Sequence, residues 1–173
     1  RYMIQDSPSR VKEQPIKFTK IYLVMTIIQI VLLLAGGMPF FDSVVHAFGT
    51  AGTGGFGIKA DSISSYSPYL QWVITIFMFL FGVNFNLYYL LLMKKVRSVV
   101  KSTEFWAYFG VTAAATIIIC ANVMSTFESF GEALRASAFQ VSSIITTTGY
   151  TTSDYGCWPL PSCMVLMIIM FIV

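Results

Sequence analysis

Four uncharged apolar runs constrain this chain more than any other feature of its sequence. A helix that crosses a bilayer needs about 20 predominantly apolar residues, and Ile21–Met38, Tyr69–Met93 and Phe105–Phe127 are of this order without a charged side chain. A fourth run, Pro159–Val173, reaches the last residue. Only 11% of the residues are charged, whereas soluble domains carry about 25%. The chain is therefore predicted to be an all-α integral membrane protein.

Basic residues collect in two places, one before the first run and one between the second and third. The first group is Arg10, Lys12, Lys17 and Lys20, and the second is Lys94, Lys95, Arg97 and Lys101. Such clusters mark the cytoplasmic side of a membrane protein. Both groups lie on that side if the first and third runs lead outward and the second and fourth lead inward.

The two outer connections then contain segments that are too apolar for ordinary exterior loops. Ser43–Ile58 and Ala136–Ser153 carry no formal charge apart from that of His46 when it is protonated. One more crossing at either place would put the two basic groups on opposite sides of the membrane. Each segment is therefore predicted to enter and leave on the outer side, as a short helix followed by an irregular return, with Asp42 as the N-cap of the first helix.

The chain repeats itself at an offset of 94 residues. Thr53-Gly54-Gly55-Phe56 falls on Thr147-Thr148-Gly149-Tyr150, and the flanking apolar runs correspond as well. The unit is an outward helix, a re-entrant segment and an inward helix, used twice in the same orientation. The expected boundaries are a cytoplasmic lead-in at 1–20, one repeat at 21–93, a basic linker at 94–104 and a second repeat, cut within its last helix, at 105–173.

A short helix followed by a Thr/Gly return is typical of an ion filter. Irregular backbone is tolerated at membrane depth only where protein buries it or water lines it. The C-terminus of a helix favours a nearby cation, and backbone carbonyls can replace the water shell of an ion. Glycine supplies the unusual dihedrals that point carbonyls at an axis. The return segments offer only neutral oxygens, whereas a divalent ion calls for carboxylates, so the pattern favours a monovalent cation.

The segments "TAGTGGFG" and "TTTGYTTSDYG", each between two membrane runs, resemble the filter segments of the Trk/Ktr/HKT potassium-uptake superfamily. The resemblance is greatest to its bacterial TrkH-type membrane subunit, which carries four helix–pore–helix repeats, each giving a quarter of a filter. It implies that the second and third repeats are present here. The implied function is potassium transport through a backbone-carbonyl filter, as the pore-forming subunit of an uptake system.

The same resemblance implies roles for particular residues and partners. The K⁺ ligands and filter residues would be Thr53, Gly54, Gly55, Thr147, Thr148 and Gly149, with Phe56 and Tyr150 as filter support. No catalytic residue and no cofactor is expected, and K⁺ is the transported ion. The implied setting is a multi-pass homodimer in the lipid bilayer of a bacterial inner membrane, gated by a cytosolic ring of nucleotide-binding subunits and without nucleic acid.

Two other readings of the function stay open at this point, namely an ion-coupled secondary transporter and a Na⁺-permeable relative. A secondary transporter needs ion or substrate ligands on broken spans, and the parallel repeat disfavours it. An enzyme is not expected, because the sequence has one histidine and no paired acid and base in a span. A disulfide between Cys157 and Cys163 is permitted by the outer location of both residues but is not required by their spacing.

Overall fold

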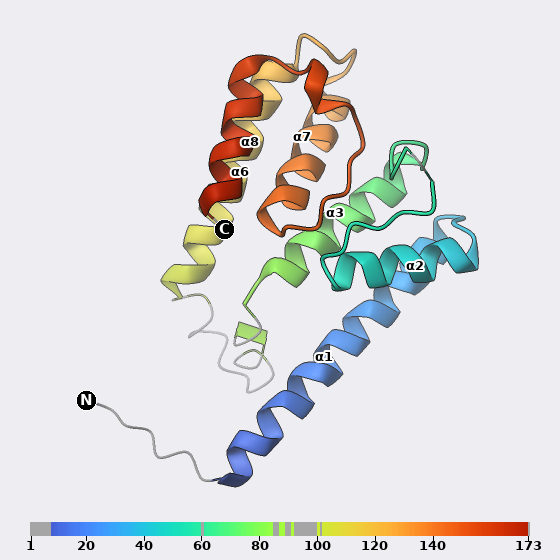
Figure 1. Cartoon of the computed structure of the whole chain (residues 1–173), viewed down its shortest axis with the longest axis vertical. Coiled ribbons are helices and arrows are strands. Elements are labelled where there is room, and N and C mark those ends of the chain that lie inside the picture. Colours follow the sequence, from blue (N-terminus) through green and yellow to red (C-terminus); the bar gives the residue numbers. More distant parts are fainter. Residues whose placement is uncertain are drawn as a thin grey trace.

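The fold consists of two similar sets of helices, seen one below the other in Figure 1. This computed structural model describes residues 8–59, 61–84, 87–88, 91, 100 and 102–172, and these contain no β-strand. The first set is α1 (Pro8–Ala35), α2 (Phe40–Ala51) and α3 (Pro68–Gly82). The second set is α6 (Thr103–Val123), α7 (Phe130–Ile145), the 3₁₀ turn η1 (Tyr155–Cys157) and α8 (Leu160–Ile172).

Two of the described helices are long and apolar enough to cross a membrane, judged by length and composition. They are the Phe18–Ala35 part of α1 and the whole of α6. The apolar helices α3 and α8 are shorter. α3 ends at Gly82 because Val83 takes an extended backbone with φ −73° and ψ 137°. The sequence placed the end of this helix at Met93; residues 85, 86, 89, 90, 92 and 93 of that run lie outside the described residues.

The helices α2 and α7 are too short to span the hydrocarbon. At about 1.5 Å per residue, the 12 residues of α2 cover about 18 Å of a core that is about 30 Å thick. The prediction that Asp42 caps α2 is wrong, because the helix begins at Phe40 after Pro39 and Asp42 lies in its first turn. The carboxylate of Asp42 instead accepts a hydrogen bond of 2.8 Å from the Tyr66 hydroxyl.

Helix α3 joins the two sets. Within its own set it packs on α1, where the Phe81 and Tyr22 rings lie 5.3 Å apart. Toward the other set, the rings of Phe79 and Tyr108 stack with centroids 4.9 Å apart. Gly82 comes so close to α6 that an added Cβ would collide with the Tyr108 hydroxyl. Helix α3 therefore provides much of the contact between the two halves.

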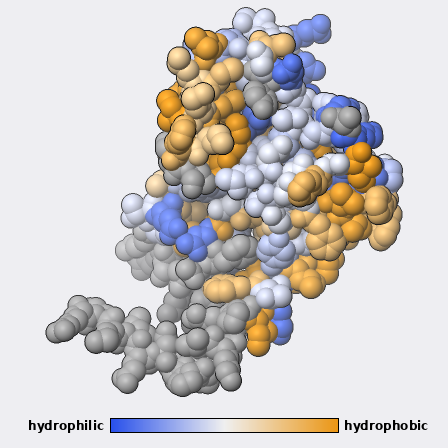
Figure 2. Space-filling view, in the orientation of Figure 1, coloured by the Kyte–Doolittle hydropathy of each residue, from blue (hydrophilic) through white to orange (hydrophobic). Residues whose placement is uncertain are grey.

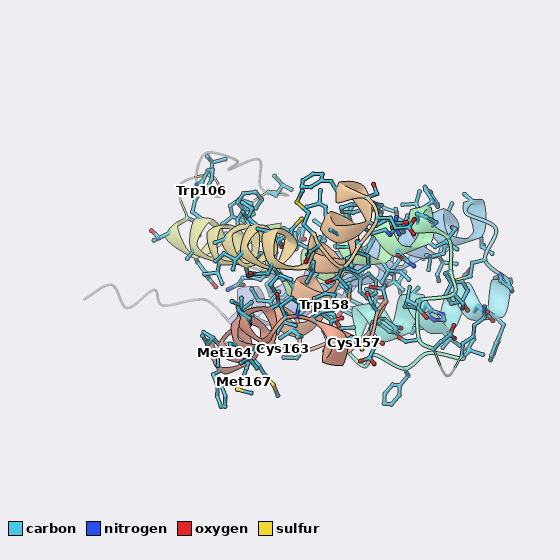
Figure 3. All side chains as sticks on the ribbon, turned by 90° about the horizontal axis from the view of Figure 1, so that it is seen from above. Trp106, Cys157, Trp158, Cys163, Met164 and Met167 are labelled. Carbon is cyan, nitrogen blue, oxygen red and sulfur yellow. The ribbon has the colours of Figure 1, made fainter. Side chains whose placement is uncertain are left out.

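Large apolar side chains also cover much of the outer surface. Figure 2 shows them over α8 and beside α2, with a paler, weakly polar band between. On α8, Met164 and Met167 are exposed and point away from the other helices in Figure 3, whereas Trp158 is buried. Cys157 and Cys163, labelled in the same view, are both free thiols. An apolar exterior of this kind suits contact with lipid.

Cysteine labelling tests whether both returns reach the outer side. Because the free, exposed Cys157 would itself react, all native cysteines of the full-length protein are first replaced by serine or alanine. We expect Lys59→Cys and Asp154→Cys to react with an impermeant maleimide added to intact cells. Thr103→Cys, at the start of α6, should react only after permeabilisation. Labelling of just one of the first two positions would exclude parallel repeats.

Candidate functional site

Both short helices end in the same hydrogen-bonded turn. After α2, the Thr53 amide donates to the Thr50 carbonyl at 3.3 Å and the Gly54 amide donates to the Gly49 carbonyl at 2.8 Å. This pair of bonds defines a Schellman motif, which closes the end of a helix by satisfying its last carbonyls. The return segment thus starts with its amide groups already paired to the helix that it leaves.

The turn after α7 repeats this pattern at the offset seen in the sequence. The Thr147 amide donates to the Ile144 carbonyl at 3.0 Å and the Thr148 amide to the Ser143 carbonyl at 2.8 Å. The Gly149 amide also reaches the Ser143 carbonyl, at 3.3 Å. The internal repeat is therefore a repeat of backbone geometry as well as of sequence.

Left-handed backbone occurs at matching positions of the two returns. The φ angles are 49° at Thr53, 55° at Thr147, 63° at Gly55 and 88° at Gly149. Glycine takes this region freely, but a β-branched threonine there is an outlier that costs on the order of 1–3 kcal/mol. The surrounding contacts hold both threonines in this conformation, and strain of this kind gathers at functional sites.

The carbonyl oxygens of the two returns are left open. Among the hydrogen bonds of the described residues, none ends on the carbonyls of residues 53–55 or 147–149. The buried Thr148 hydroxyl already has a hydrogen-bond partner, because it lies 2.8 Å from the Thr146 hydroxyl. Thr146 in turn donates to the Ser142 carbonyl at 2.6 Å. The groups free to hold an ion are thus mainly backbone oxygens.

The two returns touch each other at one of the predicted filter glycines. A Cβ added at Gly55 would collide with the carbonyl oxygen of Thr148. At Gly149, by contrast, an added Cβ would meet nothing within 4 Å among the described residues. The predicted residues of the two halves are thus brought together on the Gly55 side, while the Gly149 side is open.

The two aromatic residues predicted to support the returns are placed differently. Tyr150 is fully buried, and its hydroxyl donates to the carbonyls of Phe56 at 3.1 Å and His46 at 3.4 Å. The Ser143 hydroxyl holds the Tyr150 carbonyl at 2.7 Å. Phe56 is 76% exposed and does not pack behind the return in the described part of the chain. Tyr150 therefore braces both returns at once.

The loop at 61–67, between α2 and α3, fastens the return that follows α7. The Ile63 amide donates to the Thr151 carbonyl at 3.1 Å, and the Thr151 amide donates to the Ser62 hydroxyl at 3.2 Å. The Nε2 group of Gln71 donates to three carbonyls of this loop. The Oε1 atom of Gln71 accepts a hydrogen bond of 2.9 Å from Nε of Arg135 in α7. Sequence reasoning missed these residues, because a loop that carries Lys59 and Asp61 beside Ser62 gives no sign that its neighbours are buried.

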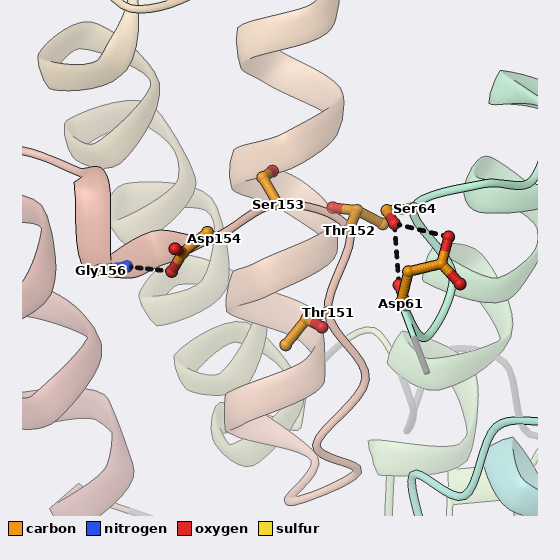
Figure 4. A pocket seen from close by; sticks show the side chains of 7 residues that line it. All are labelled: Asp61, Ser64, Thr151, Thr152, Ser153, Asp154 and Gly156. Atoms are coloured by element: carbon orange, nitrogen blue, oxygen red, sulfur yellow. Dashed lines mark hydrogen bonds between the residues drawn. The ribbon is translucent and has the colours of Figure 1, made fainter. Parts of the chain in front are cut away.

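A pocket of about 500 Å³ opens between this loop and the second return. Figure 4 shows the side chains that line it, which are Asp61, Ser64, Thr151, Thr152, Ser153 and Asp154, beside the backbone of Gly156. Asp61 accepts from the Ser64 hydroxyl and Asp154 from the Gly156 amide at 2.9 Å. The side chains that line this pocket are thus hydroxyls and carboxylates.

Tyr66, in the loop between α2 and α3, stays protonated. Burial, the hydrogen bond to Asp42 and the charges of Asp42 and Asp61 raise the pKa of Tyr66 to about 12. Its hydroxyl therefore remains a donor to Asp42 at neutral pH. The described residues contain no group of three or more His, Cys, Asp and Glu side chains that could hold a metal ion.

Comparisons with known proteins agree with this geometry. A family model described as TrkH, cation transport protein, matches residues 10–110. The Trk system potassium uptake proteins TrkH of Salmonella typhimurium and Escherichia coli K12 are each 33% identical over 145 residues, 81% of this chain and 30% of theirs. The crystal structure of the potassium transporter TrkH from Vibrio parahaemolyticus superimposes with a TM-score of 0.85 at 26% identity. It covers 96% of this chain, which spans 37% of that one.

The brace on the Tyr150 carbonyl can be tested with two serines of α7. Ser143→Ala removes the bond to Tyr150 and leaves that carbonyl unpaired, whereas Ser137→Ala removes only a bond to Ala133 within the same helix. Both side chains are fully buried. In the full-length protein in detergent, we expect Ser143→Ala to cost about 1–3 kcal/mol and to lower the thermal unfolding midpoint more than Ser137→Ala. Equal midpoints would show that the bond does not brace the return.

Proposed function

Because this chain belongs to the TrkH family of cation transport proteins, we propose that it forms two adjoining quarters of the potassium-conducting filter of an uptake system. The observation that carries the proposal is the pair of matching turns after α2 and α7, whose carbonyls stay open. The curated relatives that it matches are named as potassium uptake proteins. The chain spans about a third of their length, so it supplies part of the path.

The mechanism is permeation without covalent chemistry. A K⁺ ion exchanges its water shell for backbone carbonyls, as in other filters made of carbonyl rings. The Schellman turns keep the amides of each return turned back toward its helix, so the oxygens rather than the N–H groups meet the ion. Helices α2 and α7 end where these returns begin. The partial negative charge at the C-terminus of each helix lowers the energy of a nearby cation.

The residues proposed to contact the ion are the six predicted from the sequence, Thr53, Gly54, Gly55, Thr147, Thr148 and Gly149. Their carbonyls are the proposed ligands, because the Thr148 hydroxyl already pairs with Thr146. Tyr150 is the proposed support of both quarters, through its bond to the Phe56 carbonyl. The repeats at 21–93 and 105–173, joined by the linker at 94–104, are the proposed functional units.

The proposed setting follows from family membership and from the apolar exterior. The complete protein is placed in a bacterial inner membrane, with the basic residues inside. A second copy of the protein and a cytosolic ring of nucleotide-binding subunits are the proposed partners. The names of the relatives, which refer to a Trk system, support a membrane subunit that works with others. Preference for K⁺ over Na⁺ is part of the proposal.

Two glycines of like geometry test the filter. Gly149 and Gly37 both have left-handed backbone, with φ 88° and 84°, and a Cβ at either meets nothing within 4 Å among the described residues. Gly37 lies between α1 and α2, away from the returns. In liposomes with the full-length protein, we expect Gly149→Ser to lower ⁸⁶Rb⁺ uptake or its resistance to Na⁺ competition by about tenfold or more, equivalent to about 1.4 kcal/mol. Gly37→Ser should stay near wild type.

Membrane insertion of both variants is checked by the yield of monodisperse protein after extraction in detergent. Unchanged uptake and unchanged Na⁺ competition in inserted Gly149→Ser protein would contradict the filter assignment. An equal loss in Gly37→Ser would mean that backbone strain alone, and not the position in the return, accounts for the effect.

A further inference from the structure

A buried histidine behind the two returns has no part in the conduction path described above. His46 is fully buried in α2, and its Nδ1 lies 2.7 Å from the Asp42 carbonyl oxygen. A carbonyl only accepts, so Nδ1 carries the proton of the neutral ring. The other nitrogen, Nε2, is shielded from solvent and has no hydrogen-bond partner among the described residues. The imidazole thus presents a free lone pair inside the protein.

This ring contacts the residue that braces both returns. The rings of His46 and Tyr150 stack with centroids 5.7 Å apart and an interplanar angle of 22°. The Tyr150 hydroxyl donates to the carbonyls of Phe56 and of His46 itself. A Cβ built on Gly57 would lie 3.7 Å from Nε2, so the first return passes beside the free nitrogen. A shift of the imidazole is therefore transmitted directly to both returns.

The other half of the chain has a different residue at the same place. At the offset of the repeat, His46 corresponds to Gln140, which is buried in α7 with 3% of its surface exposed. An amide is neutral at every physiological pH, whereas histidine changes charge within that range. His46 is the one histidine of the sequence. The first quarter thus has a titratable group where the second has none.

The groups around the ring decide which form is stable. Burial opposes a charged imidazole, and so does the positive charge of Lys59 on the exposed return loop. Asp42, on the same helix, favours the charged form. The two tyrosines that pack on the ring, Tyr66 at 5.3 Å and Tyr150, are neutral. Among the described groups, none offers Nε2 an acceptor for an added proton.

We propose that His46 is a positioning residue that holds the filter only while its ring is neutral, so that acid outside the cell reduces conduction. A proton on Nε2 creates a buried cation without a partner, which is relieved only if the ring gains water. That movement takes the imidazole away from Tyr150 and loosens the bond from Tyr150 to the Phe56 carbonyl. The inference rests on the proposed function and adds a pH control to the same site.

The test compares ⁸⁶Rb⁺ uptake by the full-length protein in liposomes as the outer pH falls from about 8 to about 5. Each variant is normalised to its own flux at the higher pH. We expect wild-type uptake to fall about threefold or more, by reversible protonation of one group. In His46→Gln, which installs the residue of the other half, the ratio of the two fluxes should approach one. An unchanged acid dependence in this variant would overturn the proposal.

A second pair of variants keeps the test independent of how well His46→Gln folds. Lys59→Gln removes an exposed positive charge near the ring, so the midpoint of acid inhibition should move to higher pH. The matched control is Lys20→Gln, which changes an exposed lysine of α1 that is distant in sequence from His46. This variant should leave the midpoint of acid inhibition in place. Equal midpoints in both variants would contradict control by His46.

A measurement on the protein itself separates this inference from the proposed function. A histidine that is buried neutral stabilises the fold at higher pH and loses that contribution as pH falls. The thermal unfolding midpoint in detergent should therefore drop on acidification in the wild type, and His46→Gln should reduce the drop. Uptake that is absent at every pH would contradict the proposed function. Uptake that is present but independent of pH in the wild type would overturn the histidine proposal alone.

Discussion

The need to satisfy backbone polar groups at membrane depth governs the rest of this structure. A segment that leaves a helix inside a membrane has no water to pair its amides and carbonyls. In both returns the first amide groups are satisfied, because they donate to the last carbonyls of α2 and α7. The carbonyls without hydrogen-bond partners are the groups proposed above to hold the ion. The strained threonines at 53 and 147 are part of the same solution, because the turn requires a left-handed residue there.

The two halves share this backbone but are not interchangeable. Tyr150 of the second half reaches the carbonyl of Phe56 in the first, whereas Phe56 itself is exposed. The Thr151 amide of the second half donates a hydrogen bond to the Ser62 hydroxyl in the loop between α2 and α3. These contacts run across the seam between the quarters, so each quarter is shaped partly by residues of its neighbour. These contacts fix the position of each return relative to the other, and the proposed ion ligands lie on both returns.

The sequence allowed prediction of what is encoded locally or by repetition. The offset, the short re-entrant helices and the left-handed glycines at 55 and 149 all follow from apolar run lengths and from glycine itself. The hydrogen bonds of Ser62 to Thr151 and of Gln71 to Arg135 were not predictable, because they form only after the two halves pack together. Asp42 resembled a helix cap by position and turned out to bind Tyr66. The helix ends within the run Tyr69–Met93, at the point where Gly82 and Asn84 interrupt its apolar residues.

The hydrogen bond between Tyr150 and Phe56 joins two residues that the ribosome adds to the chain at different times. Its partners are separated by 94 residues, and translation at about 5–20 residues per second puts roughly 5–20 s between their syntheses. During that interval the first return lacks its bond to Tyr150. The insertion machinery must therefore tolerate an unfinished quarter, and a nascent chain that stalls between the halves would present open carbonyls with nothing to hold them in register.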